Sequence, residues 1–350
     1  MAIDYGAPPL LDIAGLHLSI PTSGGDLRVL RGVDYQLWQG ETLAVVGESG
    51  SGKSVSSLAL MGLHPRRASV SAERMTFDGQ NILGLSRPAL RKLRGNQMAM
   101  IFQDPMTSLN PVLTIGEQLV ETYSAHGKGS RAQATERAIY LLERVGIRNA
   151  RERLGQYPHQ LSGGLRQRVV IAIALMCNPK LIIADEPTTA LDVTVQALIL
   201  SLLKELQEEF GMALILISHD IGVVSSIADR VAIMYAGTIV ESGGADEVIH
   251  EPLHPYTRGL VDCVPRLRPG RERKPLVTIP GIVPSLLGPS RGCLFRNRCP
   301  KALDTCAMTD PAVQRTASGR VFRCIHSEAV LHAAHTRPAD PAPVAAGGRA

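Results

Sequence analysis

The stretch Gly47-Glu48-Ser49-Gly50-Ser51-Gly52-Lys53-Ser54 directly follows the apolar run Leu43–Val46. The spacing G-x-x-x-x-G-K-S after such a run predicts a buried strand, a glycine-rich loop and a helix. Glycines let the loop backbone wrap around an anion, and the N-terminus of the following helix offers it unpaired N–H groups. Lys53 would then reach the β- and γ-phosphates of a nucleoside triphosphate, and the Ser54 hydroxyl would bind Mg²⁺. The alternative is a Gly/Ser-rich surface turn, and the apolar segments on both sides of the loop argue against it.

The size and charge of the chain set limits on its class. It has 350 residues, of which 45% are hydrophobic and 20% charged, which suggests about two globular domains. The formal net charge is +5, but the basic residues form no long run. Solvated loops explain the densest spots, so no nucleic-acid partner is expected.

The ends and the hydropathy of the chain bear on its location. The first ten residues contain Asp4 and lack a basic start followed by an apolar stretch, so no signal peptide is expected. No run of 18 apolar residues occurs. We therefore expect a soluble cytoplasmic protein that reaches a membrane only through a partner.

Apolar patterns alternate along the chain as strands and helices do in an α/β protein. Residues 10–20 and 29–37 alternate like paired strands, whereas a helical insertion is expected over about 112–165. A helix over Val195–Phe210 would bury a stripe of Leu198, Leu202 and Leu206. Prolines and glycines dominate from Pro265 to Pro300, which predicts a linker into a small loop-rich module. Residues 331–350 are predicted to be disordered.

A second chemical motif is Leu181–Glu186, an apolar strand that ends in two adjacent acids. Neighbouring strand residues point to opposite sides, so the two carboxylates would have different roles. Asp185 would hold Mg²⁺ through water, and Glu186 would polarise the water that attacks the γ-phosphate. Alone, the pair could be acids at an ordinary strand end, but together with the phosphate loop it predicts a hydrolytic site.

A third motif is Leu161–Arg168, in which Ser162, Gly163 and Gly164 open a helix and offer a second anion-binding nest. An ordinary helix cap is the alternative. The three motifs and a later Ser-His pair together resemble the ATP-binding cassette (ABC) ATPases over about residues 10–260. The resemblance implies an α/β fold: a RecA-like parallel sheet core, an antiparallel β subdomain and a helical insertion.

The resemblance also implies roles for single residues. Gln103 would sense Mg²⁺ and the attacking water, and His219 would contact the γ-phosphate. Ala190-Leu191-Asp192 would cross the interface between two cassettes, whose Ser162–Gly164 nests each close over the other subunit's ATP. ABC proteins usually stack an aromatic residue on adenine, but by register Ile20 takes that place, so the residue that stacks on adenine stays open.

Two further segments narrow the resemblance to the oligopeptide/dipeptide importers. Phe102–Pro111 resembles their glutamine loop and His254–Leu260 their segment after the cassette, and the likeness continues to about residue 328. It implies a cassette over 1–260, an extension over 261–330 and a place at the cytoplasmic face of the membrane. The implied partners are two transmembrane permease subunits, a second and distinct ATPase subunit, and indirectly a substrate-binding protein. The alternatives are import of nickel, glutathione or another small solute, and a soluble ABC ATPase without a transport role.

Four of the six cysteines cluster near the C-terminus with the spacing C-x5-C-x6-C-x17-C: Cys293, Cys299, Cys306 and Cys324. Structural disulfides are not expected in a cytosolic protein, so the cluster points to metal. Four thiolates suit a [4Fe–4S] cluster or Zn²⁺, although zinc modules more often show C-x2-C pairs. The importer resemblance implies the [4Fe–4S] cluster, and four free buried cysteines are the remaining alternative.

Overall fold

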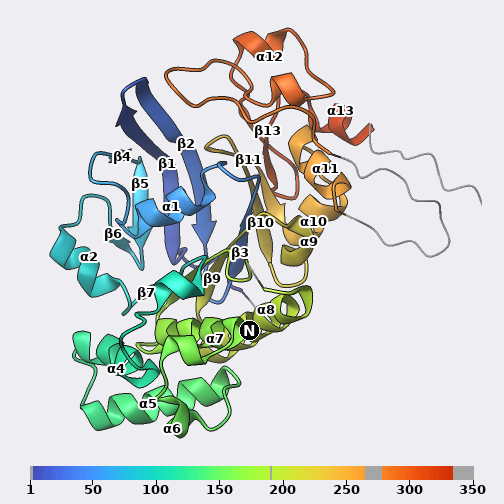
Figure 1. The fold of residues 1–350 in the computed structure, drawn as a ribbon. Helices are drawn as coiled ribbons and strands as arrows, with labels where there is room; N and C mark the ends of the chain where they lie inside the picture. Colours follow the sequence, from blue (N-terminus) through green and yellow to red (C-terminus); the bar gives the residue numbers. More distant parts are fainter. Residues whose placement is uncertain (1–2, 190, 265–277, 334–350) are drawn as a thin grey trace, which may run out of the picture.

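The computed structural model describes residues 3–189, 191–264 and 278–333. Two sheets form its centre, and helices cover them (Figure 1). The main sheet has the order β12-β13-β11-β10-β3-β9-β8-β7. Its strands are β3 (Thr42–Val46), β7 (Met98–Ile101), β8 (Leu181–Asp185), β9 (Ala213–Ser218), β10 (Arg230–Tyr235), β11 (Thr238–Gly244), β12 (Val313–Arg315) and β13 (Val321–Arg323).

The five strands from β10 to β7 are parallel to one another, and their buried residues form the core of the molecule. Every residue of β3 and β8 is buried, because helices cover both faces of a parallel sheet. This burial explains why these strands are near-continuous apolar runs in the sequence. The carboxyl ends of β3, β8 and β9 lead directly into the motif-bearing loops.

The second sheet is antiparallel and confirms the predicted β subdomain. Its strands are β1 (Leu11–Thr22), β2 (Gly25–Leu37), β4 (Ser69–Ser71), β5 (Arg74–Phe77) and β6 (Gln80–Asn81). β1 and β2 form one long hairpin that extends beyond the predicted strand ends. The hairpin is at the far side of the molecule from the helical insertion (Figure 1).

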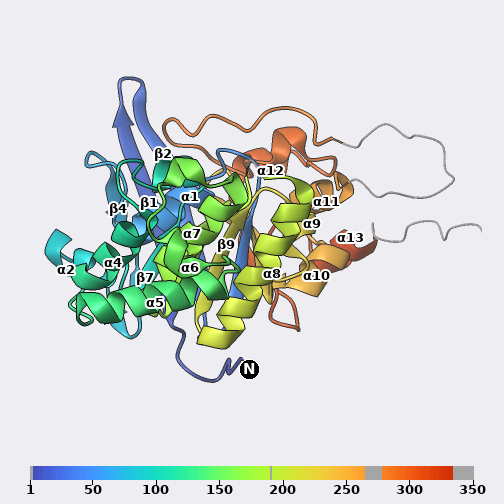
Figure 2. The same ribbon diagram turned by 60° about the horizontal axis from the view of Figure 1, so that its bottom comes forward.

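The helices divide into two groups, those around the main sheet and those of the insertion. The first group is α1 (Lys53–Leu60), α2 (Arg87–Leu93), α7 (Gly163–Leu175), α8 (Val193–Phe210), α9 (Ile221–Val224), α10 (Ala245–His250) and α11 (Pro255–Asp262). The second is α3 (Pro105–Ser108), α4 (Ile115–Ala125), α5 (Arg131–Arg144), α6 (Ala150–Arg153) and the 3₁₀ helix η1 (Pro158–Gln160). Figures 1 and 2 show α4, α5 and α6 gathered beside α7 at one end of the molecule.

One predicted stripe is wrong in part. Leu202 and Leu206 of α8 are buried, but the side chain of Leu198 is 52% exposed. Ile199 and Leu203 are fully buried in its place, so the apolar face of α8 is rotated by one residue from the predicted one. The helix has apolar residues on more than one side. Its packing in the folded protein decides which side is buried, and the sequence pattern alone does not show this.

The residues after the cassette add two strands to the edge of the main sheet. β13 pairs with the edge strand β11 through Glu241–Phe322 and Ser242–Val321, and β12 pairs with β13. The other described elements of the extension are short: η2 (Arg296–Arg298), α12 (Thr305–Met308) and α13 (Glu328–Ala333). Figure 1 shows the extension above α10 and α11, next to the β1–β2 hairpin.

The predicted disorder of residues 331–350 is wrong at its start. Leu331 belongs to α13 and is buried against Leu253 and Phe322, which gives this short helix an apolar anchor. Residues 334–350 lie outside the described part of the chain. Within the described part, no helix combines the length and the apolar content needed to cross a bilayer.

Candidate nucleotide-hydrolysis site

The phosphate loop lies between β3 and α1, as predicted. Gly50 and Gly52 have φ angles of +77° and +105°, which other residues adopt only with strain. At Gly47 the constraint is space, because a Cβ atom there would lie 2.1 Å from the backbone oxygen of Met234. The loop is therefore packed tightly against the end of β10, and only glycine fits at its first position.

Lys53 is buried at the start of α1 and points back into the loop. Its Nζ donates to the backbone oxygens of Gly47 at 2.7 Å and of Glu48 at 3.0 Å. Burial lowers the pKa of Lys53, and the nearby carboxylates of Glu186 and Asp185 oppose this effect. The ammonium group is thus held where the phosphates of a nucleotide would meet the loop.

Ser54 and Asp185 form the second polar pair of the site. The Ser54 hydroxyl donates to Oδ1 of Asp185 at 2.8 Å, which joins α1 to the end of β8. Burial raises the pKa of Asp185, and the hydrogen bond from Ser54 opposes that shift. A hydroxyl and a carboxylate are hard oxygen donors of the kind that Mg²⁺ prefers, so these residues fit the ion.

Glu186 lies at the centre of a convergent set of donors. Its Oε2 accepts from Gln103 Nε2 at 3.0 Å and from Thr189 Oγ1 at 3.0 Å. Nδ1 of His219 lies 3.3 Å from the same oxygen. Glu186 also has a φ of +45°, a conformation that costs energy for a side chain of this kind and that is common at functional sites. The geometry brings together three predicted residues and adds Thr189, which the sequence did not indicate.

One cavity of about 460 Å³ lies at this site. Its lining comes from the phosphate loop, α1 and the ends of β7, β8 and β9: Ser49, Gly50, Gly52, Lys53, Ser54, Val55, Gln103, Glu186 and His219. A cavity of this size between an anion-binding loop and an acidic residue can hold the phosphate end of a nucleotide and a water molecule.

The Ser162–Gly164 nest is not among the residues that line this cavity. It opens α7 on the surface, where Ser162 and Gly163 are exposed and the Ser162 Oγ accepts the Leu165 N–H at 3.4 Å. The nest is therefore free to act on a nucleotide held by another molecule. Of the residues predicted to cross the interface, Asp192 caps α8, and Ala190 lies outside the described residues.

Ile20 is half-buried near the end of β1, opposite Leu27 of β2. Its role beside adenine stays a prediction.

The sequence missed the contacts that the extension makes with the cassette. Arg298, Arg320 and Arg323 each pair with a carboxylate far away in the chain: Glu48, Glu241 and Asp34, respectively. Glu48 belongs to the phosphate loop, so one of these ion pairs reaches the nucleotide site itself. The only sequence signal was the position of Arg298 directly before Cys299.

The four clustered cysteines lie near one another. None forms a disulfide, and Cys306 and Cys324 are buried. Burial raises the pKa of Cys293 and of Cys324, and it raises that of Cys299 to about 11; nearby thiols of the cluster add to each shift. Nevertheless, no three His, Cys, Asp or Glu side chains among the described residues converge closely enough to hold a metal ion.

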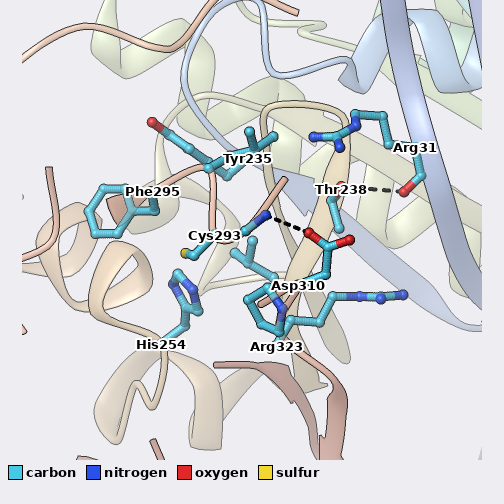
Figure 3. A pocket seen from close by; sticks show the side chains of 12 residues that line it. Arg31, Tyr235, Thr238, His254, Cys293, Phe295, Asp310 and Arg323 are labelled. Atoms are coloured by element: carbon cyan, nitrogen blue, oxygen red, sulfur yellow. Dashed lines mark hydrogen bonds between the residues drawn. The ribbon is translucent and has the colours of Figure 1, made fainter. Parts of the chain in front are cut away.

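Cys293 also borders a cavity of about 170 Å³ between the extension and the cassette (Figure 3). Arg31 and His254 reach it from the cassette, and Phe295 and Asp310 from the extension. Its polar groups have partners within the protein. Asp310 accepts the Gly292 N–H at 2.6 Å, and His254 Nδ1 accepts the Tyr256 N–H at 3.1 Å. The cavity therefore marks the junction of cassette and extension.

Comparisons with known proteins agree with the geometry of the site. The family model described as ABC transporter matches residues 30–189, and that described as oligopeptide/dipeptide transporter, C-terminal region, matches residues 240–306. The chain is similar to a solved dimer of the ATP-binding cassette MJ0796 bound to ADP and Pi. The TM-score is 0.59, the identity is 28%, and the match covers 67% of this chain and 98% of that one.

Two curated relatives from Escherichia coli strain K12 match over nearly their full length. The chain is 48% identical over 318 residues to the oligopeptide transport ATP-binding protein OppD, covering 91% of this chain and 93% of that protein. It is 47% identical over 315 residues to the dipeptide transport ATP-binding protein DppD, covering 90% and 96%. Together with the cassette fold and the convergent site, these matches confirm the predicted resemblance: the chain belongs to the ABC-type ATPases of the oligopeptide and dipeptide transporter family.

Proposed function

We propose that this chain is the ATP-hydrolysing subunit that powers import of peptides through a membrane permease. The observation that carries the proposal is the extent of the match. It covers the cassette and also the region that follows it, whose family model is described by oligopeptide and dipeptide transport. A soluble ABC ATPase without a transport role would need to share only the cassette.

In the proposed mechanism, the phosphate loop and Lys53 bind the β- and γ-phosphates of ATP. Ser54, Asp185 and Gln103 would hold Mg²⁺, which neutralises phosphate charge when bound. Glu186 accepts hydrogen bonds from Gln103 and Thr189, which aim its carboxylate at the cavity. From there it polarises the attacking water, and His219 contacts the γ-phosphate.

The exposed Ser162–Gly164 nest supports a closed pair of cassettes in which each subunit completes the other's site. We propose that the second cassette is a distinct ATPase chain and that two permease subunits bind the pair on the cytoplasmic face of the membrane. The permease would dock along Gln103–Pro111. Large apolar side chains are exposed on and beside this segment: Phe102, Met106 and Val112.

Deletion of the gene for this chain is expected to abolish uptake of a radiolabelled tripeptide by intact cells. Wild-type protein supplied from a plasmid should restore uptake, and the Glu186→Gln variant should not, because it lacks the water-polarising carboxylate. Nickel and glutathione uptake, measured in the same strains, are the controls for cargo. Loss of either of these with unchanged peptide uptake would contradict the peptide assignment.

We further propose that Cys293, Cys299, Cys306 and Cys324 bind one structural [4Fe–4S] cluster. The four thiols neighbour one another without forming a disulfide, which suits the thiolate donor set of such a cluster. The metal would add folding energy to an extension built of short elements.

Protein purified without oxygen is expected to be brown, to absorb broadly near ~400 nm and to contain about four irons per chain. Alanine at any of the four cysteines should remove the colour, whereas Cys263→Ala is the matched control and should keep it. Colourless protein with one zinc per chain would refute the iron assignment and retain the metal. Protein without metal would leave four free cysteines.

A further inference from the structure

One residue of the phosphate loop is held by the extension. The Glu48 carboxylate receives two parallel hydrogen bonds from Arg298, Nη1 to Oε2 at 2.6 Å and Nη2 to Oε1 at 2.8 Å. The Arg298 side chain is only 4% exposed. Two-pronged arginine–carboxylate pairs fix the relative orientation of both groups and are among the strongest hydrogen-bonded pairs in proteins.

Groups other than Glu48 also hold the Arg298 side chain in place. Its Nε donates to the Pro280 backbone oxygen at 2.8 Å, so a second segment of the extension fixes the guanidinium. The guanidinium carbon also lies 5.8 Å from the centre of the Tyr235 ring and 6.0 Å from that of Phe295. Arg298 is therefore a rigid support, with both its polar and its flat surfaces occupied.

The backbone of Glu48 is held as well. Its N–H donates to the Tyr256 hydroxyl at 2.9 Å, and its carbonyl oxygen accepts from Lys53 Nζ. Tyr256 is fully buried, and its ring centre lies 4.6 Å from that of Tyr235. A displacement of Glu48 would thus move one of the two carbonyl groups that hold the ammonium of Lys53.

We infer that Arg298 is a positioning residue for ATP binding. It holds Glu48, and through the Glu48 carbonyl it holds Lys53 in the place where the phosphates bind. The inference depends only on ATP binding by this chain, so it stands or fails independently of the imported cargo. The extension is then part of the nucleotide site and more than an appendage to the cassette.

The test compares full-length chains in the assembled transporter. Arg298→Met should raise the KM for ATP roughly tenfold and leave kcat at saturating ATP within about twofold, because phosphate binding by Lys53 is weakened equally in the ground state and the transition state. Calorimetric titration of the purified chain with ATP should show the same loss of affinity. Arg323→Met is the matched control. This variant breaks another ion pair of the extension, the one that Arg323 makes with Asp34 at 2.7 Å. Asp34 does not belong to the phosphate loop, so the KM for ATP should be unchanged.

Two further variants keep the test decisive. Arg298→Lys retains the charge but loses the two-pronged geometry, so it should raise the KM by an intermediate amount even if Arg298→Met fails to fold. The double variant Glu48→Gln with Arg298→Met separates positioning from charge cancellation. Positioning predicts that its KM stays high. A wild-type KM in the double variant, or in Arg298→Met itself, would overturn the inference.

Discussion

Replacing Glu186 with Gln is expected to lower steady-state ATP hydrolysis by about 10²- to 10⁴-fold, the usual contribution of a general base. Glutamine keeps the shape of the side chain and an oxygen that can accept from Gln103 and Thr189, so the site should stay assembled. ATP affinity should therefore be unchanged, because the phosphate loop and Lys53 are intact. Phosphate release by the assembled transporter and equilibrium binding of ATP measure the two quantities.

Lys53→Ala is the matched comparison for Glu186→Gln. It removes the ammonium held by the carbonyl groups of Gly47 and Glu48 and should weaken ATP binding itself. The two variants together separate binding from chemistry at residues that border the same cavity. Near-normal turnover by the Glu186→Gln transporter would exclude Glu186 as the residue that polarises water.

Arg320→Met is expected to lower the free energy of unfolding by about 3–5 kcal/mol, the cost of leaving one partner of a buried ion pair unpaired. Arg320 pairs with Glu241, and both side chains are almost completely buried. Glu241 also accepts the backbone N–H groups of Leu253 and His254, each at 2.9 Å. Denaturant unfolding followed by circular dichroism would measure the change.

Arg323→Met is a suitable reference here too, because its pair with Asp34 is partly exposed. An exposed pair contributes about 0–1 kcal/mol, so this variant should be close to wild type in stability. Equal losses for Arg320→Met and Arg323→Met would contradict the argument from burial. Combining Arg320→Met with Glu241→Gln should recover part of the loss, because no unpaired charge then stays buried and the glutamine oxygen can still accept a backbone N–H.

The sequence predicted which residues of the candidate site lie together, because nucleotide chemistry restricts both residue type and spacing. A loop that wraps around phosphate needs glycines at Gly50 and Gly52 and a lysine at the start of the next helix, and these positions are adjacent in the chain. The acids Asp185 and Glu186 follow a strand whose full burial is visible as an apolar run. Local rules were therefore sufficient to place the residues at one edge of the sheet.

The rest of the molecule depends on contacts that no local rule records. The ion pair between Glu48 and Arg298 joins residues 250 positions apart, and the pairing of β13 with β11 depends on β13, a strand of three residues with little pattern of its own. The exposure of Leu198 was missed for a related reason. Packing against the sheet selects one face of α8, and several faces of this helix are apolar enough to compete.

The pairing of β13 with β11 has a consequence for how the protein is made. Synthesis proceeds from the N-terminus, so β11 is complete before any residue of the extension exists. Until Val321–Arg323 leaves the ribosome, the nascent cassette presents the free hydrogen-bonding edge of β11 to its surroundings. Open strand edges template intermolecular pairing. The pairing of β13, the last described strand, with β11 therefore completes the sheet late in biogenesis. From then on, the paired part of the β11 edge is covered and cannot pair with other molecules.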